Sequence, residues 1–179
     1  MIRLPLPQKI ETERLLLERL RYEDAEEIFY SYASKPEATK YLSWETHKTI
    51  DETRMFLDYA VPSWDNGTDF AYSIRLKNRL FIGGIGISND NGKIQFGYAI
   101  SPLHWGHGYT TEACSRLLGI VKTMKGVYRI GTFVDCENAA SIRVLQKCGL
   151  IEEARLPKWF RFINQGNRVK DCLFFRLLP

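Results

Sequence analysis

Two glycines alternate with larger residues in the segment Trp105-Gly106-His107-Gly108-Tyr109-Thr110, which joins a predicted strand to a predicted helix. Glycines allow the backbone to curl so that successive N–H groups converge on one point. The N-terminus of the following helix adds a partial positive charge at the same place. This combination predicts an anion-binding cradle that suits a pyrophosphate.

A second segment with polar side chains, Asp135-Cys136-Glu137-Asn138-Ala139-Ala140-Ser141, leaves one predicted strand and enters the next helix. Asparagine is a favoured N-cap residue, so Asn138 is expected to begin that helix. Ser141 lies one turn further along, and the two side chains can therefore face one cleft. A plain helix cap and a solvent-facing serine are the alternative interpretation of the same residues.

Several familiar catalytic patterns do not fit this chain. The segment from Gly86 to Lys93 resembles a phosphate-binding loop, but it has one residue too many between its glycines and no Ser or Thr after its lysine. Neither Gly-x-Ser-x-Gly nor His-Glu-x-x-His occurs. His104 and His107 have no third candidate ligand close in sequence, so no metal site is predicted.

The composition is that of an ordinary globular protein. The chain has 179 residues, of which 45% are hydrophobic and 26% are charged, and these values exclude a disordered or fibrous protein. No linker, repeat or low-complexity segment divides the chain, so residues 1–179 are expected to form a single domain. The net charge of +4 is too small to indicate a nucleic-acid-binding protein.

The chain is expected to be cytoplasmic. Its first residues have neither the apolar core nor the cleavage site of a secretory signal, and no apolar run approaches the length of a membrane span. The cysteines are too widely spaced for a zinc site or a disulfide scaffold, so reduced thiols are expected. They are Cys114, Cys136, Cys148 and Cys172.

Hydrophobic periodicity predicts about seven strands and four helices. Alternating apolar and polar residues predict strands, and apolar residues at three- and four-residue spacing predict helices. Asn89-Asp90-Asn91-Gly92 predicts a hairpin turn, while Asp24 and Thr49 are expected helix N-caps. The predicted strands cover 15–17, 70–76, 80–87, 94–100, 128–134, 150–163 and 169–178, and the helices begin near 24, 49, 111 and 138. This order of elements predicts a mixed α/β or α+β layered domain.

In this order and spacing, the motifs resemble those of the GNAT acetyltransferases, and in particular those of their RimJ/RimL-like branch. The resemblance implies a GNAT-like fold, with a central mixed and mostly antiparallel sheet and two parallel strands that splay around the cofactor. The matching segments run nearly end to end and are 11–17, 41–44, 97–100, 105–113 and 138–150.

The resemblance implies an N-acetyltransferase that passes the acetyl group of acetyl-CoA directly to an amine in a ternary complex, without a metal. Backbone N–H groups near residues 98–100 would bind the thioester carbonyl, and the amides of residues 106–110 would bind the pyrophosphate. Ser141 would protonate the leaving thiolate, and Asn138 would hold the pantetheine arm. The implied catalytic residues are Ser141 and Tyr98, and the implied cofactor-binding residues are Ile100, Trp105, Gly106, His107, Gly108, Tyr109, Thr110, Asn138, Ser141, Arg143 and Lys147.

The general base is left open by the resemblance. Related enzymes often carry a glutamate where this chain has Gln95, and an amide side chain cannot accept the proton. Asp135, Glu112, Tyr98 and an ordered water are the remaining candidates. For Arg143 and Lys147, an exposed helix face is the alternative to a contact with the cofactor phosphates.

The amine acceptor is expected to be a protein N-terminal α-amine or a small-molecule amine. Trp44, Gln95 and Trp159 are expected on the acceptor side. The loops at 41–50 and 155–168 are expected to set the specificity for the acceptor. A homodimer is compatible with the resemblance.

Two other functions remain open at this point. Gln95 suggests a non-catalytic acyl-CoA-binding module, which would bind acetyl-CoA without turnover. The basic C-terminal part suggests a binder of nucleic acid or of the ribosome, whose affinity would depend steeply on salt. Six basic residues lie between Arg155 and Arg176 against one acidic residue, Asp171.

Overall fold

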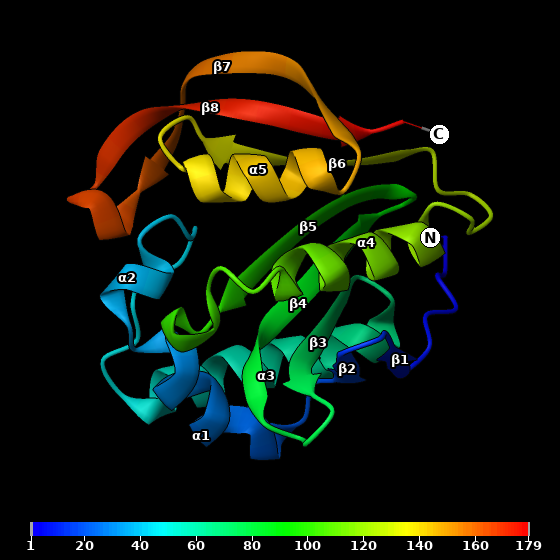
Figure 1. The fold of residues 1–179 in the computed structure, drawn as a ribbon, viewed down its shortest axis with the longest axis vertical. Helices are drawn as coiled ribbons and strands as arrows, with labels where there is room; N and C mark the ends of the chain where they lie inside the picture. The colour runs from blue at the N-terminus through cyan, green and yellow to red at the C-terminus, as the bar shows by residue number, and fades with distance from the viewer. Residues whose placement is uncertain (1, 179) are drawn as a thin grey trace.

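An eight-stranded sheet forms the centre of the fold (Figure 1). The computed structural model describes residues 2–178. The strands stand in the order β1-β2-β3-β4-β5-β6-β8-β7, and every neighbouring pair is antiparallel except β5 and β6. The bounds are β1 Lys9–Glu11, β2 Leu15–Arg19, β3 Asp69–Leu76, β4 Phe81–Asp90, β5 Lys93–Ile100, β6 Arg129–Asp135, β7 Leu150–Phe162 and β8 Arg168–Leu177.

Five α-helices among the described residues cover the two faces of this sheet. Helix α4 crosses one face, whereas α1 and α3 lie on the other (Figure 1). The sequence specifies the ends of α3 locally, because the Glu52 carboxylate accepts from the Thr49 amide at 3.0 Å and Gly67 ends the helix with a left-handed φ of 76°. The bounds are α1 Ala25–Ile28, α2 Pro36–Thr39, α3 Ile50–Asn66, α4 Tyr109–Val121 and α5 Ala139–Lys147.

The parallel strands β5 and β6 separate along their length, as the resemblance implied. Their ladder consists of three residue pairs, from Lys93 with Arg129 to Gln95 with Gly131. Strand β5 continues to Ile100, but β6 no longer pairs with it beyond this point. The mixed sheet and its splayed strands confirm the predicted fold class. In Figure 1, α5 and the β7–β8 pair lie on the β6 side of the split.

Two elements were missed by the sequence prediction. Strand β1 is only three residues long, and it is held at the sheet edge by pairing with β2. Helix α2 is one short turn that begins at Pro36. Neither segment is long enough to show a hydrophobic period. Helix α4 also starts at Tyr109, two residues before the predicted position, because the left-handed Gly108 already serves as its N-cap.

Asp24 occupies the predicted N-cap position of α1, but it does not cap the helix through its side chain. Instead it accepts from the Arg21 amide at 2.9 Å and from Arg75 Nη2 on β3 at 2.9 Å. A second contact from Arg75 Nη1 to Glu27 Oε1, also at 2.9 Å, ties α1 to the sheet. The Asp24 carboxylate therefore forms a tertiary ion pair with Arg75 instead of the helix-capping hydrogen bond that the local sequence pattern predicted.

No helix within residues 2–178 is long and apolar enough to span a membrane.

The buried ion pair should be the most costly one in the molecule to break. Arg75→Met is expected to lower the free energy of unfolding by about 3 kcal/mol, because it removes the buried partner of the Asp24 carboxylate and leaves only the exposed Arg21 side chain to pair with it. The side chains of Arg75 and Asp24 are only 5% and 2% exposed. Urea denaturation at neutral pH measures the loss.

Arg79→Met is the matched control for this prediction. Arg79 pairs with Glu18 from a position that is 54% exposed, so its loss should cost less than about 1 kcal/mol. Equal losses in the two variants would contradict the special role of the buried pair.

Candidate active site

The segment at 105–110 forms a turn that exposes its backbone amides at the start of α4. Gly106 and Gly108 have left-handed φ angles of 80° and 78°, which residues with side chains rarely adopt. In the described part of the chain, no amide from residues 106–111 donates a hydrogen bond. The turn therefore presents free N–H donors together with the positive end of a helix dipole, as an anion cradle requires.

Arg14, next to β2, holds this turn in place. Its Nη1 donates to the His107 carbonyl at 3.0 Å. Its guanidinium carbon lies 4.7 Å from the centre of the Tyr109 ring, and the His107 ring stacks on Tyr109 at 5.5 Å. The sequence analysis missed Arg14 as a site residue, because its contact with His107 joins positions 93 residues apart. The predicted residues His107 and Tyr109 thus form part of a braced turn.

Glu112 braces the same turn from inside α4. Its carboxylate accepts from Thr12 Oγ1 at 2.6 Å, from the Arg14 amide at 2.9 Å and from Arg14 Nε at 2.7 Å. Partial burial raises the pKa of Glu112, but these hydrogen bonds and the charge of Arg14 outweigh it and lower the pKa overall. A carboxylate stabilised in this way is a weak proton acceptor. Glu112 therefore has a structural role and is removed from the candidate bases.

The edge of β5 that faces the split carries free backbone donors. Thr132 Oγ1 donates to the Phe96 carbonyl at 2.9 Å, and Trp105 Nε1 donates to the Ile100 carbonyl at 2.9 Å. Alternate residues of a strand direct their hydrogen-bonding groups to the same edge. The N–H groups of Tyr98 and Ile100 consequently lie on this edge, where no strand pairs with them. These amides are available to a ligand in the split.

The hydroxyls of Tyr98 and Ser141 meet at a distance of 2.7 Å. Asn138 positions Ser141, because its side-chain oxygen caps α5 by accepting from the Ser141 amide at 3.1 Å. This confirms the predicted N-cap. Burial raises the pKa of Tyr98 well above its ordinary value, with a further contribution from the nearby Cys114. Tyr98 therefore stays neutral, and it can donate a proton in a hydrogen bond but cannot serve as the base.

The basic residues at the C-terminal half of α5 are exposed. Arg143 and Lys147 have no ion pair or side-chain hydrogen bond within residues 2–178. Cys148 Sγ, at the end of the same helix, donates to the Thr111 carbonyl at 3.6 Å, which brings this end of α5 to the start of α4. Free cationic side chains there are in keeping with a phosphorylated ligand.

Asp135 is enclosed by the protein and is therefore also removed from the candidate bases. Its side chain is almost fully buried, with 1% of the residue exposed. One carboxylate oxygen accepts from the Glu137 amide at 2.9 Å, and the other accepts from Gln165 Nε2 at 2.8 Å. These bonds hold the end of β6 to the turn between β7 and β8.

The residues expected on the acceptor side lie on three separate elements. Trp44, in the loop between α2 and α3, packs its ring 4.9 Å from that of His47. Gln95 is exposed on β5, and Trp159 on β7 is 54% exposed. The two loops predicted to set specificity are in direct contact, because Asn164 Nδ2 donates to the Trp44 carbonyl at 2.8 Å. The sequence analysis did not single out Asn164.

A pair of cysteines lies between α4 and α5, close to Tyr98. The hydrogen bond from the Cys114 thiol, followed by that from Ser115, lowers the pKa of Cys148 to about 7, although partial burial opposes this. Ser115 Oγ lies 3.4 Å from Cys148 Sγ. The buried Cys114 has a raised pKa because burial disfavours its thiolate. Only the fold reveals this difference, since the two thiols look alike in the sequence.

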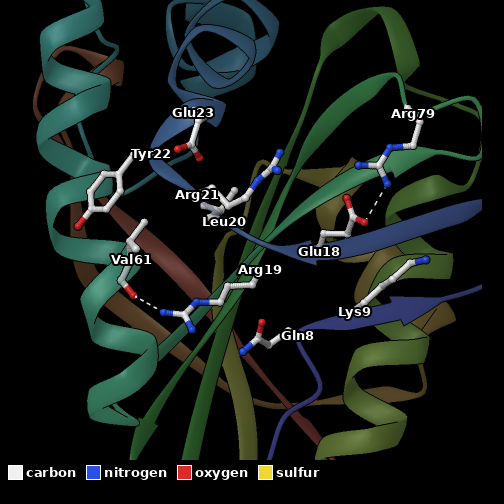
Figure 2. Close-up of a pocket in the computed structure, with 10 residues that line it drawn as sticks. All are labelled: Gln8, Lys9, Glu18, Arg19, Leu20, Arg21, Tyr22, Glu23, Val61 and Arg79. Carbon is white, nitrogen blue, oxygen red and sulfur yellow. Dashed lines mark hydrogen bonds and ion pairs between the residues drawn. The ribbon is translucent and has the colours of Figure 1, made fainter.

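A depression of about 540 Å³ lies elsewhere on the molecule, between the β1–β2 pair and α3 (Figure 2). Three of its charged side chains are already engaged: Arg19 donates to the Val61 carbonyl at 3.1 Å, and Arg79 pairs with Glu18 at 2.8 Å. None of the predicted site residues lines it. Within residues 2–178, no group of three His, Cys, Asp or Glu side chains is placed to hold a metal ion.

Comparisons with known proteins identify relatives of this chain. A model of the acetyltransferase (GNAT) domain matches residues 14–151. The chain is 30% identical over 171 residues to the uncharacterized N-acetyltransferase p20 of Bacillus licheniformis. This alignment covers 93% of this chain and 94% of that protein.

Two solved structures have a similar fold. An acetyltransferase (GNAT family) from Bacillus anthracis aligns with a TM-score of 0.82 and 24% identity, over 95% of this chain and 98% of that one. RimL, a ribosomal L7/L12 alpha-N-protein acetyltransferase solved with coenzyme A, aligns with a TM-score of 0.86 and 15% identity, over 95% and 97%. At these identities, the structures show the shared fold alone.

The cysteine environment predicts a specific pH dependence of alkylation. With iodoacetamide, the rate at Cys148 should rise through a pH of about 7 and then level off, because the thiolate is the reacting form. Cys136 should keep gaining rate at higher pH, since partial burial raises its pKa above the ordinary value. Mass spectrometry of the labelled peptides separates the two sites. Ser115→Ala should shift the Cys148 profile to higher pH, and an unchanged profile would contradict the hydrogen bond.

Proposed function

The chain belongs to the acetyltransferase (GNAT) domain family, and we propose that it uses acetyl-CoA to acetylate an amine by direct transfer in a ternary complex. The observation that carries this proposal is the convergence of three groups around the β5–β6 split. The free amides of residues 106–111 lie at the start of α4, the free N–H groups of Tyr98 and Ile100 lie on β5, and the Ser141 hydroxyl lies on α5.

The residues present fit acetyl-CoA in their chemical types. Amides of residues 106–110 supply donors for a pyrophosphate, with a helix dipole of the right sign behind them. Arg143 and Lys147 supply exposed cations for further phosphates. Asn138 and the open edge of β5 offer polar partners for an amide-bearing arm in the split. When bound, the thioester would supply an activated acetyl group.

This chain's own residues would stabilise the charges that develop during transfer. The N–H groups of Tyr98 and Ile100 would donate to the carbonyl oxygen as it becomes negative. As the carbon–sulfur bond breaks, the Ser141 hydroxyl would give its proton to the sulfur, while the neutral Tyr98 hydroxyl at 2.7 Å donates a hydrogen bond to the Ser141 oxygen. The proton that the ammonium group loses to water would then restore the Ser141 hydroxyl. No protein nucleophile is required, so orientation of the two reactants supplies much of the rate, on the order of 7–11 kcal/mol.

An ordered water is our proposal for the acceptor of the ammonium proton. Glu112 is held by Thr12 and Arg14, Asp135 is enclosed, and Tyr98 remains neutral. Of the four candidate bases that the sequence analysis left open, an ordered water is the one that these contacts do not remove. An amine with a low pKa would need little further help, because much of it is already neutral.

We propose a protein N-terminal α-amine or a small-molecule amine as the acceptor, in line with a RimJ/RimL-like enzyme. The motif from Trp105 to Ala113 supports this branch. The four cysteines are free thiols, which suits a reducing cytoplasm.

The two rival functions are less well supported. A non-catalytic module would not need the Tyr98–Ser141 hydroxyl pair in the split. Against a nucleic-acid binder, three of the six basic residues in the C-terminal part are already paired with acids: Arg155 pairs with Asp171 at 3.2 Å, Arg176 pairs with Glu153 at 3.3 Å and Lys170 pairs with Glu137.

Acetyl-CoA should stabilise the chain against heat, and Gly108→Asp should abolish the effect. A ligand at about 100 times its dissociation constant adds about 2.7 kcal/mol of stability, whereas NADH and ATP should add little. The new carboxylate would stand in the anion cradle and repel the pyrophosphate. Differential scanning fluorimetry with and without each ligand measures the shift.

Gly67→Asp is the control for backbone strain in this experiment. Gly67 has a similar left-handed φ of 76°, with no atom near the position of a new Cβ, but it ends α3 on the face of the sheet opposite to α4. This variant should keep the full shift with acetyl-CoA. An equal shift in a folded Gly108→Asp variant would refute the cradle.

Ser141→Ala should lower kcat about 100-fold while leaving the affinity for acetyl-CoA almost unchanged, because the proton donor acts as the thiolate leaves. Steady-state kinetics with an amine that the wild type acetylates gives kcat, and thermal shift reports the affinity. Tyr98→Phe should act in the same direction, and the double variant should lose little more than Ser141→Ala, since the two hydroxyls form one hydrogen-bonded unit. Ser115→Ala, which removes a hydroxyl on α4, should retain the rate. A wild-type rate in Ser141→Ala would assign Ser141 to the helix alone.

A further inference from the structure

The turn between β7 and β8 contains a side chain that joins two remote parts of the fold. Asn164 belongs to the short helical turn Ile163–Gln165. Its Nδ2 donates to the Thr39 carbonyl and to the Trp44 carbonyl, each at 2.8 Å. Its Oδ1 accepts from the Thr46 amide at 3.0 Å and from Thr46 Oγ1 at 3.2 Å. Both ends of one amide are thus used to hold a single loop.

These contacts determine the path of the loop from Thr39 to Thr46. The loop contains little regular structure of its own, because α2 ends at Thr39 and α3 begins only at Ile50. Thr39 Oγ1 and Thr46 Oγ1 also meet at 2.6 Å, which closes the loop on itself. A backbone without regular pairing depends on such side-chain partners to stay in one conformation.

The same turn is anchored on the cofactor side of the split. Gln165, the next residue, donates from Nε2 to the buried Asp135 carboxylate at 2.8 Å. Asp135 ends β6 and also accepts from the Glu137 amide, one residue before the cap of α5. The turn therefore holds the loop at a definite place relative to the helix that carries Ser141.

We propose that Asn164 is the positioning residue of the acceptor site: it holds the loop from Thr39 to Thr46, including Trp44, as one wall for the amine. This inference rests on the proposed function, because the loop borders an acceptor only if the chain acetylates one. Asn164 acts through the loop and touches no reacting atom. Its loss should weaken acceptor binding and leave acetyl-CoA binding intact.

The test combines hydrogen exchange with kinetics on the full chain. In Asn164→Ala, amides of residues 39–49 should exchange faster by mass spectrometry, while peptides from β4, β5 and α4 keep their protection. Spermidine and short peptides with a free N-terminal Ser or Ala serve as acceptor probes. For the best probe, KM should rise about tenfold, with the KM for acetyl-CoA within about twofold of the wild type.

Two further variants make the result specific to the amide. Asn164→Asp keeps the shape and the oxygen that faces Thr46, but it loses both donors and turns a charge toward two carbonyls, so it should match or exceed the alanine variant. Asn164→Asp also provides the test of the positioning role if Asn164→Ala does not fold. Asn167→Gly removes a neighbouring exposed side chain at a left-handed position, with φ of 58°, that glycine adopts freely. This control should behave as the wild type.

The outcomes separate the two proposals. An active wild type with unchanged exchange and unchanged acceptor KM in both Asn164 variants would overturn the positioning role and leave the proposed function standing. An equal rise of the KM values for acceptor and acetyl-CoA would show a general structural role and also overturn it. A wild type that binds acetyl-CoA but acetylates none of the probes over long incubation would count against the proposed function, and the acceptor role would fall with it.

Discussion

The pairing of β5 with β6 stops after three residue pairs, and the candidate site depends on that interruption. A parallel strand continuing beside β5 would use the N–H groups of Tyr98 and Ile100 in its own ladder. The separated edge instead keeps these donors for a ligand. Side chains form hydrogen bonds with β5 at both ends of this interruption. Thr132 Oγ1 donates to the Phe96 carbonyl at one end, and Trp105 Nε1 donates to the Ile100 carbonyl at the other.

The two sides of the split are braced by different polar contacts. On the proposed cofactor side, Arg14 and Glu112 form an ion pair at 2.7 Å that holds the glycine turn to the edge of β2. On the proposed acceptor side, Asn164 holds a loop that has no ladder of its own. Both braces connect segments about 100 or more residues apart in the chain. Such contacts keep polar backbone groups satisfied while leaving the space between them open.

The proposed chemistry depends on a tyrosine that stays neutral and on a glutamate whose carboxylate is held by hydrogen bonds. Burial keeps the Tyr98 hydroxyl protonated, so that it can support Ser141 as a donor. Hydrogen bonds and a neighbouring cation keep Glu112 ionised and engaged. A direct transfer between two bound reactants asks the protein for orientation, hydrogen-bond donors and one proton donor. The described residues supply these without a nucleophile.

Features that depend on neighbours in sequence were determined by the sequence itself. The glycine turn at 105–110, the Asn138 cap and the alternating strands follow from backbone preferences that act within a few residues. The mixed sheet with splayed strands followed from motifs in a fixed order. Only the tertiary structure decided the partners of Asp24, Arg14 and Asn164, and the contact of Tyr98 with Ser141. A polar side chain can bond to any group that folding brings near, and long-range packing rather than local preference selects that group.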